Sequence, residues 1–179
     1  MGSAEAASPA ASRMNSANAR TSRRMWTVFW IGLVAGTLDI SENIIFNAFR
    51  HITAYQIFQY IASGLIDGKS FSMGGASVAL GVAIHYTIAM TWTVIFYLLS
   101  RRVLVLTRQA TICGIVYGGV VYVVMNFVVL PMTRVPHAHA AVSVASRVSG
   151  VLALLLCIGL TIALLVKRFA PPANAAERL

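Results

Sequence analysis

The stretch Gly32–Phe46, GLVAGTLDISENIIF, decides the fold. It is apolar enough to enter a lipid bilayer, yet it carries two carboxylates, Asp39 and Glu42, near its middle. At about 100° per residue of an α-helix, both acids share one face with the small residues Gly32 and Gly36. Because hydrocarbon solvates charge badly, an acid in a membrane helix must face protein or water. The stretch therefore predicts a first transmembrane helix whose acidic face is covered by other helices.

The composition of the whole chain also predicts a membrane protein. Of its 179 residues, 58% are hydrophobic and only 11% are charged, whereas soluble domains carry about 25% charged residues. A net charge of +9 would suggest nucleic-acid binding in a soluble protein. Here the arginines cluster at the ends of apolar runs, where membrane topology explains them. We therefore expect the lipid bilayer as a partner and no nucleic acid.

Four apolar runs are long enough to cross a bilayer, at about residues 25–49, 74–99, 110–130 and 142–166. Residues 52–66 are shorter than the roughly 20 residues that a span needs, and Gln56 and Gln59 lie among their aromatic residues. Such a segment is typical of a short interfacial helix. The predicted fold class is an all-α, polytopic membrane protein with four transmembrane helices and a short interfacial helix between the first and second.

The spans define one domain with two tails. Residues 1–24 are rich in Ala and Ser and predict a disordered cytoplasmic tail, residues 25–168 a single four-helix transmembrane domain, and residues 169–179 a short polar C-terminal tail. Four spans place both termini on one side. Basic residues are more numerous on that side than on the other, so the positive-inside rule predicts that both termini are cytoplasmic.

Small residues mark the faces on which the helices pack. Gly32 with Gly36, and Gly114 with Gly118, have the GxxxG spacing that permits close helix approach, and Gly81 lies in a seam of small residues on the second span. The two GxxxG faces need not both be used within one chain. A homodimer, or contact with another membrane protein, is therefore a candidate assembly.

Five polar residues are expected at a similar depth in the outer half of the bundle: Asp39, Glu42, His85, Asn126 and Arg147. Asp39 lies about 21 Å along the first helix at 1.5 Å per residue. Two interpretations stay open. Arg147 could pair with an acid, with the other groups completing hydrogen bonds that fix the helix register. Alternatively, the cluster is a proton or ion path, or a polar ligand pocket.

Other chemistry has weaker signals. His137 and His139 form an HxH pair in a loop without a nearby third ligand, so they are weak metal candidates. The two cysteines form no CxxC pair. No GxSxG or HExxH motif occurs, so we assign no catalytic residue and no cofactor.

The strings GLVAGTLDI (Gly32–Ile40), GGASVALGVAIHY (Gly74–Tyr86) and YGGVVYVVMNFVVLP (Tyr117–Pro131), with IASGL between the first two, resemble a family of small bacterial four-helix inner-membrane proteins. A more distant likeness is to the YagU-type membrane proteins. The resemblance implies a bacterial inner-membrane location and transfers no site residues. The leading functional hypothesis is a non-enzymatic inner-membrane protein with a polar cluster inside its bundle. A small proton-coupled transporter or channel subunit is the alternative, and a haem-binding or enzymatic membrane protein the third option.

Overall fold

The computed structural model describes residues 9–135 and 143–170, and in these ranges all regular structure is helical. The first long helix is α1 (Pro9–Ala48). It is followed by α2 (Ala54–Ile66), a 3-10 turn η1 (Asp67–Phe71) and the long α3 (Gly75–Arg102). A short α4 (Val105–Arg108) precedes a continuous helix made of α5 (Ala110–Val124), η2 (Met125–Val129) and α6 (Leu130–Met132). The last helix joins α7 (Val144–Ala153), η3 (Leu154–Leu160) and α8 (Thr161–Phe169).

Four helices are long and apolar enough to cross a membrane: Thr21–Ala48, Gly75–Arg102, Ala110–Met132 and Val144–Phe169. They agree with the four predicted spans to within a few residues. The helix expected at residues 52–66 is present as α2, and Thr53 and Gln56 form a capping box at its start. The carboxamide of Gln56 accepts from the Thr53 amide, and the Thr53 hydroxyl accepts from the Gln56 amide, which satisfies two amides that a helix start leaves open.

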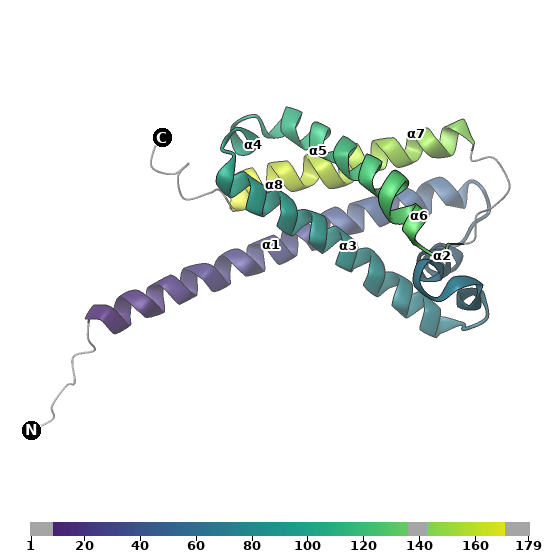
Figure 1. Ribbon diagram of the computed structural model, residues 1–179, viewed down its shortest axis with the longest axis horizontal. Helices are drawn as coiled ribbons and strands as arrows, with labels where there is room; N and C mark the ends of the chain where they lie inside the picture. Colours follow the sequence, from purple (N-terminus) through teal and green to yellow (C-terminus); the bar gives the residue numbers. More distant parts are fainter. Residues whose placement is uncertain (1–8, 136–142, 171–179) are drawn as a thin grey trace, which may run out of the picture.

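The start of α1 differs from the prediction. The sequence predicted a disordered tail up to residue 24, whereas the helix begins at Pro9. Low hydrophobicity suggested that this segment cannot bury enough surface to fold. Alanine and arginine are nevertheless strong helix formers, and proline suits the first helical position. Local propensity therefore extends α1 beyond the bundle (Figure 1).

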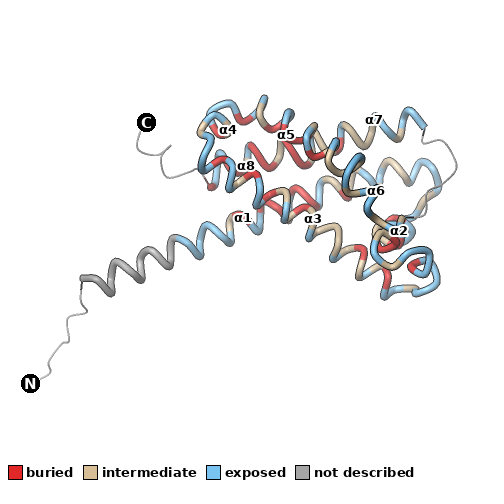
Figure 2. Tube along the Cα trace, in the orientation of Figure 1, coloured by how far each residue is buried: buried red, intermediate tan, exposed pale blue. Residues whose placement is uncertain are grey.

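The buried core lies at the end of the bundle that is remote from α2. Phe96 of α3 and Tyr117 and Val121 of α5 pack against Ile162 and Val166 of α8. The Tyr117 hydroxyl donates to the Trp92 carbonyl at 2.6 Å. Figure 2 shows buried segments gathered where α1, α3, α5 and α8 meet, while residues 21–26 of α1 are exposed. The opposite end is more loosely filled, and it holds the cavity described below.

All five glycines predicted to pack do lie at helix contacts. Gly32 and Gly36 face Met90 and Ala89 of α3. Gly114 and Gly118 instead meet the backbone of η3 near Gly159 and Leu154, and Gly81 meets the backbone of α2 at Phe58. Both GxxxG motifs are thus used within the chain. The homodimer therefore stays a prediction, without the support of a spare GxxxG face.

Candidate functional site

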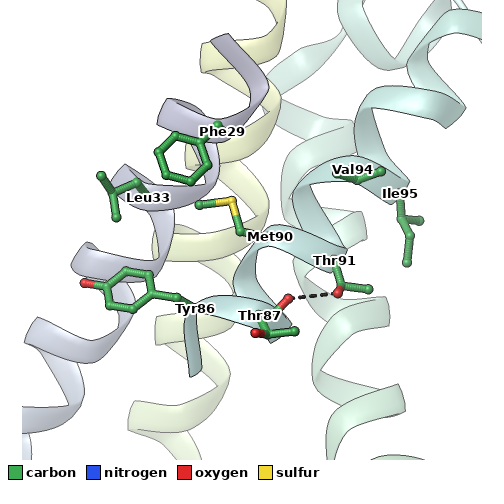
Figure 3. Close-up of a pocket in the computed structure, with 8 residues that line it drawn as sticks. All are labelled: Phe29, Leu33, Tyr86, Thr87, Met90, Thr91, Val94 and Ile95. Atoms are coloured by element: carbon green, nitrogen blue, oxygen red, sulfur yellow. Dashed lines mark hydrogen bonds between the residues drawn. The ribbon is translucent and has the colours of Figure 1, made fainter. Parts of the chain in front are cut away.

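Two concavities in the described part of the chain differ in chemistry. The first is an open groove of about 530 Å³ between α1 and α3. Figure 3 shows its lining, which includes Phe29 and Leu33 of α1 and Met90 of α3. The Thr91 hydroxyl is bonded to the Thr87 carbonyl of its own helix. The groove contains no charged side chain and none of the predicted site residues.

The second concavity is a partly open cavity of about 500 Å³ lined by all four long helices and α2. Its walls are mainly apolar, with Ile88 and Trp92 from α3, Val121 from α5 and Ile158 from η3. Four of the five predicted residues line it: Asp39, His85, Asn126 and Arg147. The fifth, Glu42, lies outside the lining. We refer to this space as the bundle cavity.

α2 covers one end of the bundle cavity. Its residues Tyr60 and Gly64 line the space, and the Gly64 carbonyl accepts a hydrogen bond of 3.0 Å from the Arg134 amide beyond α6. Gln59 on the buried side of α2 donates to the Ser70 carbonyl at 3.2 Å. Burial raises the pKa of Tyr60 above its ordinary value, so its hydroxyl stays a hydrogen-bond donor throughout the neutral pH range.

Asp39 and His85 form the polar side of the cavity nearest the core. The Nε2 atom of His85 donates to the Gly36 carbonyl at 2.9 Å, which fixes the imidazole against α1 almost one turn before Asp39. The Asp39 carboxyl group is within electrostatic range of both His85 and Glu42. Among the described residues it has no hydrogen-bond or ion-pair partner. The carboxyl group is therefore free to contact whatever occupies the cavity.

Glu42 has a different partner from the one predicted. The Ser149 hydroxyl of α7 donates to its Oε1 atom at 2.5 Å. The proposed ion pair between Arg147 and an acid is absent: in residues 9–135 and 143–170 the Arg147 guanidinium bonds to nothing and is exposed. Residues 147 and 149 are about 200° apart around a helix. When Ser149 faces α1, Arg147 therefore points elsewhere, toward the cavity mouth.

Asn126 occupies the wall opposite α1. Its Nδ2 atom donates to the Tyr122 carbonyl of the preceding turn at 2.9 Å. Among the described residues, Asn126 therefore makes no hydrogen bond to another helix, whereas the interpretation of the cluster as a fixed register expected one. Its position within η2 is notable because η2 and η3 are both π-helical segments, a geometry that is frequent at functional sites. Met125 of η2 and Leu154 and Ile158 of η3 also line the cavity.

The two histidines predicted as weak metal ligands cannot be compared with the structure. His137 and His139 lie outside the described residues. Within the two described ranges, no group of three or more His, Cys, Asp or Glu side chains is placed to hold a metal ion.

Sequence reasoning missed several residues of the site. Ser149 was overlooked, although Ser143, Ser146 and Ser149 repeat every three residues and so suggested a polar helix face. Tyr60 and Trp92 also line the cavity, but aromatic residues in apolar runs give no signal that separates a cavity wall from a lipid-facing surface. The π-helical segments have no recognisable sequence pattern either.

Comparisons of the chain with protein-family models, with curated proteins and with solved structures find no match. The resemblance to small bacterial inner-membrane proteins therefore stays a prediction.

Proposed function

We propose that this chain is a non-enzymatic, multi-pass integral membrane protein that binds a small amphipathic molecule inside its helix bundle. The observation that carries the proposal is the bundle cavity, whose apolar walls hold a few polar groups at defined positions. Ligand sites have volumes of about 300–1,000 Å³ and are mostly apolar with a few orienting polar groups. The cavity volume of about 500 Å³ falls within this range.

Membrane insertion is supported by the outer surface of the four long helices. Large apolar side chains are exposed along all of them, including Ile45, Ile112, Phe127 and Leu152. Contiguous apolar surface of this kind marks a membrane or an interface rather than a water-facing exterior. The basic residues at one end of the bundle favour cytoplasmic termini, and the family resemblance favours a bacterial inner membrane.

Ligand entry can be measured through Trp92, which lines the cavity. In a Trp26→Phe/Trp30→Phe variant, Trp92 is the sole tryptophan. We expect small bromophenyl compounds to quench its fluorescence saturably in lipid nanodiscs, because bromine quenches only at contact. A second variant that retains Trp26 alone, which is 62% exposed, reports the unsaturable quenching caused by probe dissolved in the lipid.

A matched pair of glycine variants locates the binding. A side chain introduced at either Gly150 or Gly119 would meet open space. Gly150 lines the cavity, whereas Gly119 lies outside the lining. Gly150→Leu is expected to fill the cavity and remove the saturable quenching, and Gly119→Leu to preserve it. Quenching that is equal in both variants would contradict the proposal.

Proton-coupled transport is the second candidate, favoured by the two titratable side chains Asp39 and His85 in the cavity lining. Groups of this kind inside a membrane domain are typical of proton relays. This candidate predicts proton flux in proteoliposomes under an imposed pH gradient, with loss of flux in Asp39→Asn at unchanged expression and folding. Flux no higher than in empty liposomes would exclude it.

A further inference from the structure

Two charges of opposite sign border the bundle cavity without neutralising each other. Asp39 and Arg147 both line it, and no ion pair within 4 Å joins them or links either one to another described residue. Glu42, the acid closest to Asp39 in sequence, is already bonded to Ser149. The cavity thus has one unpaired carboxyl group on α1 and one unpaired guanidinium on α7.

A ligand can complete this arrangement. The partly buried Asp39 carboxyl group gains from an opposite charge or hydrogen bonds, and the exposed Arg147 guanidinium is available to an anionic group at the cavity mouth. The planar guanidinium of arginine binds a carboxylate or phosphate through paired hydrogen bonds, and a carboxylate binds an ammonium group. A molecule that carries both groups would satisfy both ends of the cavity at once.

We propose that the ligand of the bundle cavity is a small zwitterion with an apolar body, its ammonium group at Asp39 and its anionic group at Arg147. This inference rests on the proposed function. The apolar body would contact Ile88, Trp92 and Ile158. An apolar α-amino acid has this chemistry.

The test uses four probes that share one bromophenyl body and differ only in charge. They are 4-bromophenylalanine (zwitterion), 4-bromophenethylamine (cation), 3-(4-bromophenyl)propanoate (anion) and 2-(4-bromophenyl)ethanol (neutral). Their dissociation constants are measured by quenching of Trp92 in the single-tryptophan, full-length protein in nanodiscs. We expect the zwitterion to bind at least tenfold more tightly than each of the other three, because loss of either charge leaves a protein charge unpaired.

Charge variants assign each end of the ligand. Asp39→Asn is expected to weaken the binding of the zwitterion and the cation and to leave the affinity for the anion unchanged. Arg147→Gln is expected to weaken the binding of the zwitterion and the anion and to leave the affinity for the cation unchanged. Glu42→Gln, at an acid outside the lining, is the matched control and is expected to leave the order of the four probes unchanged.

The outcomes separate the two proposals. Equal affinity for all four probes, or tighter binding of a singly charged probe than of the zwitterion, would overturn the zwitterion assignment and leave binding in the cavity intact. If no probe gives saturable quenching that Gly150→Leu removes, both proposals are overturned.

Discussion

Gly81 is the residue at which α2 rests on α3. A Cβ atom at this position would overlap the backbone of Phe58, and backbone cannot move aside as a flexible side chain can. Gly81→Ala is therefore expected to destabilise the protein by about 1–3 kcal/mol, the usual cost of overpacking. The measurement is thermal unfolding in detergent. Gly75→Ala, in the same helix but with open space, is the control, and equal melting temperatures for the two variants would contradict the prediction.

Glu42 and Ser149 provide the hydrogen bond that ties α1 to α7. Hydrogen bonds between membrane helices contribute about 0.6 kcal/mol on average and up to about 1.7 kcal/mol. A double-mutant cycle with Glu42→Gln and Ser149→Ala should therefore give a coupling free energy of unfolding in the upper part of that range, because the acceptor is a carboxyl group. A coupling energy of zero would mean that the two side chains act independently.

The same residues show where sequence reasoning reached its limit. The helical wheel correctly placed Asp39 on the covered face of α1, because the 3.6-residue period is a local property. It could not identify the partner of Glu42, since that depends on how α7 is rotated against α1. A rotation of less than half a turn exchanges Ser149 for Arg147. Pairing between helices is thus a tertiary property that one sequence does not disclose.

At the level of elements, we expect α2 to control access to the bundle cavity, because its residues line that space. It covers one end of that space and is held by a capping box at Thr53 and by the bond from the Arg134 amide to the Gly64 carbonyl. Removing the cap weakens the first turn of α2 without touching the cavity wall. The strength of the cap should therefore set how fast a ligand exchanges.

Thr53→Ala tests this role of α2. Loss of an N-cap costs about 1 kcal/mol, so amide hydrogen exchange in the first turns of α2 should accelerate about fivefold. The dissociation rate of a bound bromophenyl probe should rise in parallel. Thr87→Ala is the control, because the Thr87 hydroxyl is bonded only within its own helix. Unchanged exchange in α2 would contradict the prediction.

Among the elements, the long helices were predictable and their irregularities were not. Apolar runs of adequate length define the spans on hydropathy alone, and the Gln residues of segment 52–66 indicated a separate short helix. The π-helical segments η2 and η3 could not be anticipated. A π-helix alters the rotation of everything beyond it, so a helical wheel with a regular 3.6-residue period misplaces the residues of the last span that follow Leu154.

For the whole molecule, the distribution of basic residues predicts the orientation in the membrane. Arg101, Arg102, Lys167 and Arg168 lie at the bundle end remote from α2. A fusion of green fluorescent protein after Leu179 is expected to fluoresce, because that protein folds in the cytoplasm. Alkaline phosphatase fused after Ser72, beyond α2, is expected to be active because it requires export. The reverse pattern would invert the proposed topology.

The contact between α5 and η3 has a consequence for how this chain could change over evolutionary time. Gly118 lies directly against the backbone at Leu154, and Val121 and Ile158 of the same two helices line the cavity. An alanine at position 118 would push the two backbones apart and so change the width of the cavity that they line. For the proposed ligand, the accepted size would thus be adjustable by a single methyl group at position 118, which lies outside the cavity lining. A lineage could then acquire a new preference while every residue that lines the cavity stayed the same.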